Sequence, residues 1–294
     1  MVVVAFQGEL GAFSEAAARA YFGNGIQLSP SATFRDVFLK VSTGEADRGV
    51  IPIENSLAGS VHENYDLLLE HSLHIVGEVK LRIVHHLVAN KGVALPDVRR
   101  VFSHPQALAQ CQEFLRGLPG VTPVPVYDTA GAAKELKASG MRDAAAISSA
   151  QAAMDYELEI LASGIESNHQ NFTRFLIVAL QPDADRDRPG NKKVSVAFAL
   201  HHAPGTLFKS IGVFALRDID LLKIESRPIP GTPWQYLFYL DFAGDVEEPR
   251  VGKALDHLGE LTSFLRVLGC YPIGDTIDSA TPFARDRAGQ DSER

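Results

Sequence analysis

The chain has 294 residues, a hydrophobic content of 46%, a charged content of 22% and a formal net charge of −8. This length is ample for two domains with their own cores, and the composition is that of a globular protein. The acidic balance argues against a nucleic-acid or anionic-membrane partner, which would need a basic face, yet a small anionic ligand needs only local donors. Cys111 and Cys270 lie far apart and lack metal-ligand spacing.

The beginning of the sequence reads as a first strand and not as a leader. Residues 1–6 form an apolar run that is too short for a signal peptide and has no basic lead. No stretch approaches the length of a transmembrane helix. We therefore expect a cytoplasmic protein with reduced cysteines.

Residues 1–180 alternate short apolar strands with helical patterns, which is typical of an α/β domain. The expected strands are 2–6, 49–53, 81–89, 100–102, 121–126, 144–147 and 175–180. The expected helices include 33–41, 61–71, 105–115 and 130–137.

A linker and a second domain follow. Residues 181–193 are charged, broken by proline and without apolar periodicity, which predicts a linker. Residues 194–273 read as the split-βαβ, ferredoxin-like order βαββαβ. Its expected elements are strand 194–201, helix 205–216, strand 221–227, strand 236–242, helix 250–267 and strand 269–272. Residues 274–294, rich in Asp, Arg, Ser and Gly, predict a mobile tail.

The first strand runs into a glycine-containing loop. Gly8 and Gly11 allow a tight turn, Ala12 follows, and Ser14 is a candidate N-cap for the next helix. Free N–H groups at that helix start favour an anion, although a simple turn explains the same residues. The loop matches neither a Walker motif nor a dinucleotide fingerprint.

Two further strands end in polar residues. The strand ending at 102 leads into Ser103, His104 and Gln106, where Ser103 is a candidate cap; a well-capped helix is the plain alternative.

The strand ending at 53 leads into Glu54, Asn55 and Ser56. Because the carboxyl ends of strands in open α/β sheets face the ligand crevice, these residues predict a polar site.

The run from Asn171 to Phe175 carries the strongest signal. Asn171 and Thr173 fit a glycosylation sequon, and Arg174 fits either a surface ion pair or an anion clamp beside Phe175. Without a signal peptide we do not expect the sequon to be glycosylated. The three polar junctions described above supply residues that could form a site together with this run.

Other candidate sites are weaker. His85-His86 and His201-His202 alternate across strands, so adjacent histidines face opposite ways and read as ordinary, partly exposed residues. No Gly-x-Ser-x-Gly elbow supports a hydrolase.

Taken together, the motifs resemble those of prephenate dehydratases over residues 1–273. The resemblance rests on Gly8-x-x-Gly11-Ala12-Phe13-Ser14-Glu15, Pro52-Ile53-Glu54-Asn55-Ser56, Ser103-His104-Pro105-Gln106-Ala107-Leu108, Asn171-x-Thr173-Arg174-Phe175 and Ile224-Glu225-Ser226-Arg227-Pro228. It implies a two-lobed catalytic domain with the type II periplasmic-binding-protein fold over 1–180, with the site between the lobes, and an ACT regulatory domain over 194–273.

The resemblance also implies a reaction. Prephenate would lose carbon dioxide and hydroxide and become phenylpyruvate, without metal or organic cofactor. Thr173 is the residue marked as essential, and we expect it to hydrogen-bond the departing hydroxyl. Arg174 is expected to clamp a carboxylate. Glu54 is a candidate acid, because burial can raise the pKa of a carboxyl group into a useful range. Alternatively, it orients Asn55 or Ser56.

The implied effector is phenylalanine. Its site would use Gly205, Thr206 and Leu207 together with Glu225, Ser226, Arg227 and Pro228. Thr206 departs from the alanine usual in the family, which leaves the effector's identity and affinity open. Because an ACT sheet alone leaves an exposed edge, we expect a homodimer or homotetramer.

Two alternatives remain open. An arogenate dehydratase would use the same motifs on a substrate that carries an amino group. A non-catalytic amino-acid-binding sensor could share the fold, although a sensor would not need Thr173 beside Arg174.

Overall fold

The computed structural model describes residues 1–182, 190–201, 203–229 and 235–283, which separate into two compact units. Unit 1 contains Met1–His71, Val79–Ile177 and the chain from Asp275 onward, whereas unit 2 contains Ser72–Glu78 and Val178–Gly274. No helix among these described residues is long and apolar enough to cross a membrane.

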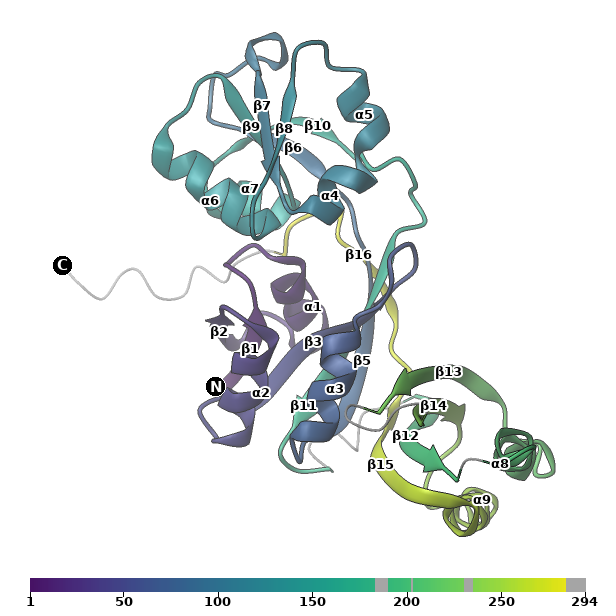
Figure 1. Cartoon of the computed structure of the whole chain (residues 1–294). Helices are drawn as coiled ribbons and strands as arrows, with labels where there is room; N and C mark the ends of the chain where they lie inside the picture. Colours follow the sequence, from purple (N-terminus) through teal and green to yellow (C-terminus); the bar gives the residue numbers. More distant parts are fainter. Residues whose placement is uncertain (183–189, 202, 230–234, 284–294) are drawn as a thin grey trace. The chain divides into compact units, whose positions relative to one another are not determined.

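Unit 1 has two lobes, each built on one sheet (Figure 1). The first lobe contains β1 (Val2–Gln7), α1 (Phe13–Phe22), β2 (Ile26–Ser31), α2 (Phe34–Ser42), β3 (Arg48–Asn55), β4 (Gly59–Ser60), α3 (His62–Glu70), β5 (His74–Arg82), β11 (Phe172–Ala179) and β16 (Thr276–Asp278). Its strand order is β16-β5-β11-β3-β1-β2, with β4 paired to β3. The boundary between the units falls within β5 and β11.

The second lobe lies between β5 and β11 in the sequence. It contains β6 (His86–Ala89), a short 3-10 helix (Leu95–Asp97), β7 (Arg100–Ser103), α4 (Pro105–Gln110), α5 (Gln112–Arg116), β8 (Thr122–Pro125), α6 (Thr129–Ser139), β9 (Ala144–Ser148), α7 (Ala150–Asp155) and β10 (Glu159–Ser163). Its strand order is β10-β6-β9-β7-β8. Residues 83–85 and 164–171 connect the lobes.

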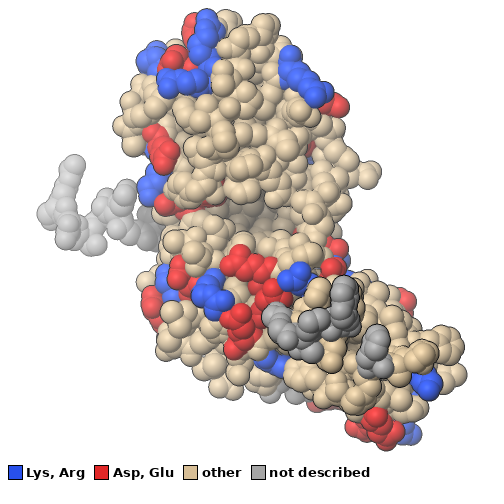
Figure 2. Space-filling model, viewed as in Figure 1, with Lys and Arg blue, Asp and Glu red and all other residues tan. Residues whose placement is uncertain are grey.

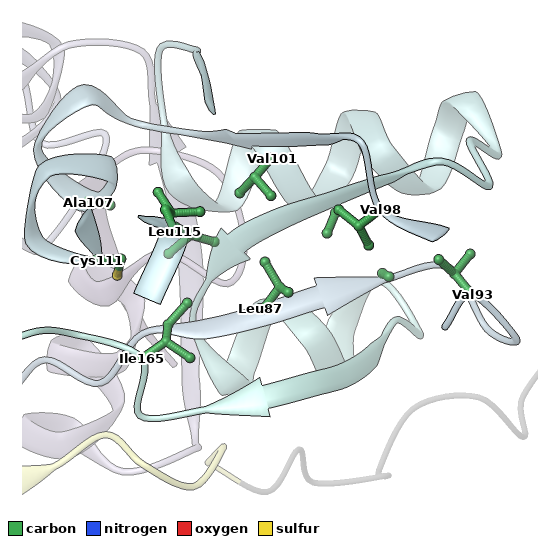
Figure 3. Close-up of a cluster of buried hydrophobic side chains, with 11 residues drawn as sticks. Leu87, Val93, Val98, Val101, Ala107, Cys111, Leu115 and Ile165 are labelled. Atoms are coloured by element: carbon green, nitrogen blue, oxygen red, sulfur yellow. The ribbon is translucent and has the colours of Figure 1, made fainter. Parts of the chain in front are cut away.

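The second lobe has its own apolar core (Figure 3). Leu87 and Val101 from the sheet face Cys111 and Leu115 from the helices, and Ile165 closes the cluster. Each large side chain that is removed from water contributes roughly 1.5–3 kcal/mol. The core therefore holds α4 and α5 firmly on the sheet.

Parallel pairing directs several strand ends toward one side of each sheet. β1 pairs in parallel with β2 and β3, and β7 pairs in parallel with β8 and β9. The carboxyl ends of parallel strands lie at the same edge, which is where open α/β sheets bind ligands.

Unit 2 has the predicted βαββαβ order. Its elements are β12 (Lys192–Leu200), α8 (Thr206–Ala215), β13 (Leu221–Pro228), β14 (Tyr236–Ala243), α9 (Pro249–Leu261) and β15 (Thr262–Pro272). The strands form an antiparallel sheet in the order β13-β14-β12-β15, which is the ferredoxin-like plan. Val213, Phe214 and Leu258 pack on this sheet from the two helices.

The predicted helix 250–267 is too long. α9 ends at Leu261, and β15 begins at Thr262 and pairs with β12 along its length. Leu265 and Leu268 fit a helical stripe in the sequence, but Leu265 lies opposite Phe198 in the sheet instead. The hydrogen bonds available along β12 override the local helical periodicity.

Other boundaries also differ from prediction. The strand expected over 81–89 is two strands interrupted at 83–85, and the helix expected over 105–115 divides at Cys111. β11 begins at Phe172, so the run from Asn171 lies at the start of the strand and within it.

The predicted tail is partly ordered. Thr276–Asp278 forms β16, which pairs in parallel with β5, and Asp278 forms an ion pair with Arg82 at 2.9 Å. Residues 183–189 of the predicted linker and 284–294 of the predicted tail lie outside the described residues. The unpaired edge of β5 explains why this segment becomes a strand.

Unit 2 contains a buried ion pair between Lys193 and Glu78. The Lys193 side chain is 3% exposed and that of Glu78 is 0% exposed. Asp241 lies 3.7 Å from the Lys193 ammonium, and its carboxylate accepts a 2.6 Å hydrogen bond from Ser195. Because the ammonium is removed from water, it depends on these carboxylates.

Replacing Glu78 with alanine should lower the free energy of unfolding by about 3–5 kcal/mol, because a buried Lys193 charge then loses its main counterion. Urea unfolding followed by circular dichroism measures the change. Glu70→Ala is the matched control: Glu70 is 49% exposed and forms an ion pair with exposed Arg35 at 2.6 Å, so water can replace it. Equal stability of the two variants would contradict the role given to Glu78.

Candidate active site

A cavity of about 510 Å³ opens between the two lobes of unit 1. Figure 2 shows the surface hollowed between the lobes on the face drawn there. The predicted site residues that line the cavity are Ala12, Ser14, Asn55, His104, Gln106, Thr173 and Phe175. The tertiary structure therefore brings together residues from all four predicted motifs of this unit.

The cavity lies at the carboxyl ends of strands, as the sequence predicts. Gln7 at the end of β1, Asn55 at the end of β3 and His104 just after β7 line it. Thr33 after β2 and Asp128 after β8 also line it, and the sequence analysis did not identify these two. Both are side chains that cap helices, and this pattern is visible in the sequence.

First-turn residues of five helices line the cavity. They are Ser14 of α1, Phe34 of α2, Glu63 of α3, Gln106 of α4 and Thr129 of α6. Free N–H groups and the helix dipole make such ends favourable for anions. Among the described residues that line the cavity, none is Lys or Arg. An anionic ligand in this cavity would therefore meet hydroxyl, amide and N–H donors among the described lining residues.

Ser14 was predicted to be the N-cap of α1, and the structure shows that it is not. Ala12 occupies the cap position without a side-chain bond. The Glu15 carboxylate accepts from the Gly11 N–H at 2.8 Å and from the Arg19 guanidinium at 2.7 Å. This arrangement leaves Ser14, which lies within the first helical turn, to line the cavity.

Ser103 was predicted to cap α4, and this prediction is also wrong. Its buried hydroxyl donates to the carbonyl of Ile147 at 2.7 Å, which ties β7 to β9. His104 is the cap, and its Nδ1 accepts from the Gln106 N–H at 3.2 Å. Ser103 therefore supports the site without lining it.

The loop after β1 packs against the second lobe. Gly11 has a φ of 88°, and an added Cβ would lie 2.6 Å from the Cα of Ala152. The Ser149 hydroxyl, which caps α7, donates to the Gly11 carbonyl at 2.5 Å. Glycine at position 11 thus allows the backbone of this loop to approach that of α7 closely, and Gly11 does not line the cavity.

Asn55 holds Thr173 by a hydrogen bond. The Asn55 Oδ1 accepts from the backbone N–H groups of Leu57 and Ala58, at 3.0 and 2.9 Å. Its Nδ2 donates to the Thr173 Oγ1 at 3.0 Å and to the Asn171 Oδ1 at 2.7 Å. The Thr173 hydroxyl thus accepts from Asn55, and its own proton is left for a ligand in the cavity.

Two residues that the sequence analysis did not identify extend this network. The Nδ2 of fully buried Asn171 donates to the Gln110 Oε1 at 3.1 Å, and the His85 Nε2 lies 2.9 Å from the same oxygen. Gln110 and His85 both line the cavity, whereas Asn171 supports it from behind. Gln110 follows Gln106 by one helical turn, a spacing that could have identified it.

The predicted exposure of the His85-His86 pair is wrong. His85 is 2% exposed and His86 is 3% exposed. Burial lowers the pKa of both rings, so they are neutral at neutral pH. No group of three or more His, Cys, Asp or Glu side chains that could hold a metal ion occurs in the part of the chain that the structure describes. His202 lies outside that part.

Glu54 and Arg174 lie away from the cavity. Alternation along β3 and β11 places them on the face opposite to Asn55 and Thr173. Their charged groups are 3.8 Å apart, and neither residue lines the cavity. The cavity lining therefore gives no support to the predicted acid role of Glu54 or the predicted carboxylate-clamp role of Arg174.

Ser56 joins the strand ends. Its hydroxyl donates to the Gln170 carbonyl at 2.8 Å and accepts from the Phe172 N–H at 2.9 Å. Ser56 therefore fixes the segment that carries Asn171 and does not line the cavity.

The predicted effector residues all lie in unit 2. Gly205 is the N-cap of α8 with a φ of 78°, and Thr206 and Leu207 begin the helix. The Thr206 hydroxyl donates to the Ala203 carbonyl at 2.9 Å. Glu225, Ser226, Arg227 and Pro228 lie on β13, an edge strand of the sheet.

Comparisons with known proteins identify similar sequences and folds. A family model described as prephenate dehydratase matches residues 4–183. Over 288 residues, the chain is 48% identical to arogenate dehydratase/prephenate dehydratase 2 of Arabidopsis thaliana, which covers 94% of this chain and 74% of that protein.

Two solved structures have a similar fold throughout. The prephenate dehydratase of Arthrobacter aurescens in complex with L-Phe is 33% identical, with a TM-score of 0.84, and covers 92% of this chain and 90% of that chain. GqqA, described as a quorum-quenching acylase, is 36% identical, with a TM-score of 0.84, and covers 92% and 98%. These similarities confirm the predicted two-lobed domain followed by a ferredoxin-like domain.

The comparisons contradict the predicted cytoplasmic location. Three Arabidopsis thaliana relatives that are 46–48% identical are named as chloroplastic proteins. The prediction rested on the first residues of the sequence. Residues 2–7 form strand β1 of the folded domain, and Val4, Ala5 and Phe6 within it are buried.

Gly11→Ala should destabilise the protein by about 2 kcal/mol or more, because the left-handed backbone and the contact with Ala152 both oppose a Cβ. Gly23→Ala separates the two causes. Gly23 has a φ of 76° but nothing within 4 Å of an added Cβ, so that variant should lose only about 1 kcal/mol. Thermal unfolding of both variants makes the comparison, and equal losses would exclude the close approach to Ala152 as a cause.

Proposed function

The chain belongs to the prephenate dehydratase family, whose members are hydro-lyases, and we propose that it converts prephenate to phenylpyruvate. In this reaction the bond between the ring and its carboxylate breaks, and its electron pair enters the ring. The hydroxyl on the opposite ring carbon leaves as carbon dioxide is released, and a proton completes it to water. Aromatisation of the ring supplies the driving force, so the proposed reaction uses neither metal nor organic cofactor.

The observation that carries the proposal is the hydrogen bond between Asn55 and Thr173. The Asn55 amide occupies a lone pair of the Thr173 oxygen at 3.0 Å. The threonine proton is then oriented away from Asn55 and serves the departing hydroxyl, on which negative charge develops. A threonine is too weak an acid to give up its proton near neutral pH, so its part is stabilisation by a hydrogen bond.

The anionic groups of the substrate suit the helix starts around the cavity. The substrate carries two carboxylates, and Ser14 of α1 and Thr129 of α6 belong to first turns whose backbone N–H groups favour anions. His104 and Gln106 add side chains from the second lobe. Binding between both lobes would orient the ring relative to Thr173.

Arogenate is the second candidate substrate, and the acidic residues of the cavity favour it. Glu63 and Asp128 line the cavity, and a carboxylate would pair with the ammonium group that arogenate has and prephenate lacks. A relative from Petunia hybrida, 48% identical, is named arogenate dehydratase 2.

Turnover of both substrates by the purified protein tests the proposal. Thr173→Ala should lower kcat by about 10²-fold with little change in KM, since one donor to developing charge is lost. Thr173→Ser, which keeps the hydroxyl, should recover much of the rate. Near-normal turnover by Thr173→Ala would exclude the role given to Thr173, and no turnover of either substrate by the unaltered protein would support a sensor instead.

Glu63→Gln separates the two substrates. It should raise KM for arogenate and leave KM for prephenate unchanged if the carboxylate binds the amino group. Arg174→Ala serves as the control from outside the cavity.

We also propose that unit 2 binds phenylalanine and pairs with a second copy. The Arthrobacter aurescens relative is described in complex with L-Phe. Phe208 of α8 and Leu216, its C-cap, are 81% and 83% exposed, and Ile224 of the edge strand β13 is 45% exposed. Apolar side chains beside an open sheet edge suit an interface between subunits.

Sedimentation with and without phenylalanine tests this pairing. Ile224→Lys should shift the protein toward monomer and weaken phenylalanine binding, because a charge would have to be buried in the interface. Leu39→Lys is the control: Leu39 is 53% exposed on α2 of unit 1. A protein that sediments as a monomer under both conditions would contradict the proposal.

A further inference from the structure

The hydrogen bonds behind the cavity have a fixed direction. The backbone N–H groups of Leu57 and Ala58 can only donate, so the atom of Asn55 that faces them is its oxygen. Its nitrogen therefore faces Asn171, whose oxygen accepts and whose nitrogen must point the other way. Each amide is oriented by the one before it.

The same reasoning extends to Gln110 and His85. The nitrogen of Asn171 donates to Gln110, so the Gln110 atom at that contact is its oxygen. The His85 Nε2 lies 2.9 Å from this oxygen, which can only accept. The His85 Nε2 therefore carries a proton. Because burial lowers the pKa of His85, the ring is neutral and its Nδ1 is bare.

The surroundings of His85 hold the ring in place. Phe13 of α1 meets it edge-on, with ring centroids 5.5 Å apart. The backbone N–H of His85 donates to the buried Glu166 carboxylate at 3.0 Å. The Nδ1 has no hydrogen-bond partner among the described residues. Within this network, the His85 ring therefore acts as a hydrogen-bond donor through Nε2.

We propose that His85 is a positioning residue for the dehydration, acting through Gln110, Asn171 and Asn55 to hold the Thr173 hydroxyl as a donor. This inference rests on the proposed function. Gln110 belongs to the second lobe, whereas Asn55 and Thr173 belong to the first. The His85 proton secures the Gln110 amide in the orientation that accepts from Asn171, and so it fixes the α4 side of the cavity relative to Thr173.

Loss of the His85 donor leaves the Gln110 oxygen with one partner instead of two. The amide can then turn, and its nitrogen would oppose the nitrogen of Asn171. Since Asn171 shares its partner Asn55 with Thr173, the disturbance reaches the reacting group. Substrate contacts elsewhere in the cavity stay in place, so kcat should fall more than KM rises.

The kinetic test compares substitutions at His85 and at its neighbour. His85→Leu should lower kcat roughly tenfold or more, in line with the effect of outer partners that orient active groups. His85→Gln, which can offer an N–H near the Nε2 position, should recover most of the loss. His86→Leu is the matched control, because His86 is equally buried but does not line the cavity. It should retain full activity.

A double-mutant cycle separates positioning from general damage. In a Thr173→Ala background, His85→Leu should lower kcat little further, because its effect passes through Thr173. Two outcomes would overturn the proposal. One is a double variant whose loss of kcat equals the product of the losses of the two single variants, and the other is a His85→Gln variant that is no more active than His85→Leu.

Nitrogen-15 NMR of labelled histidine reads the tautomer without turnover. His85 should carry its proton on Nε2, and Gln110→Met should shift that population because the acceptor is removed. A proton on Nδ1 in the unaltered protein would overturn the relay. If the tautomer is as proposed but the unaltered protein converts neither substrate, the proposed function has failed and the hydrogen-bonded relay stands. Gln110→Met also provides a second break in the relay should His85→Leu not fold.

Discussion

The orientation of one buried amide underlies the site. Asn55 follows a buried strand, and the turn after it presents two backbone N–H groups that bind its oxygen. The amide nitrogen is thereby committed to Thr173 and Asn171. An amide that could turn over would offer Thr173 a donor or an acceptor at random, whereas this one always offers a donor.

Alternation along two neighbouring strands separates this network from the nearest charges. Asn55 and Thr173 lie on the cavity side of β3 and β11, while Glu54 and Arg174 lie on the other face and form an ion pair. Residues adjacent in sequence thus have opposite surroundings. The ion pair thus lies outside the network that Asn55 and Thr173 form on the cavity side.

The absence of Lys and Arg among the described lining residues gives the cavity a particular chemistry. Helix starts supply partial positive charge at fixed positions, and no flexible cation has to be ordered when an anion binds. Such fixed dipoles would suit the proposed reaction, in which charge moves across a ring. Glu63 and Asp128 are the acidic side chains among the described lining residues, and the proposed preference between a keto acid and an amino acid rests on them.

The sequence by itself determined the α/β domain, the βαββαβ domain and the motifs that meet at the cavity, because strand alternation, helix periodicity and turn residues are local properties. The two lobes of the first domain were implied only by the family resemblance. The sequence also indicated Thr173 and Asn55. Only the tertiary structure decided that Arg174 faces away, that Ser103 ties two strands together and that His85 and Gln110 join the site. The register of β11 against β3 and the crossing of residues 83–85 between the lobes set these outcomes, and both depend on contacts between residues far apart in the chain. For the same reason β15 replaced the end of a predicted helix, since its hydrogen-bond partners lie on a strand more than sixty residues away along the sequence.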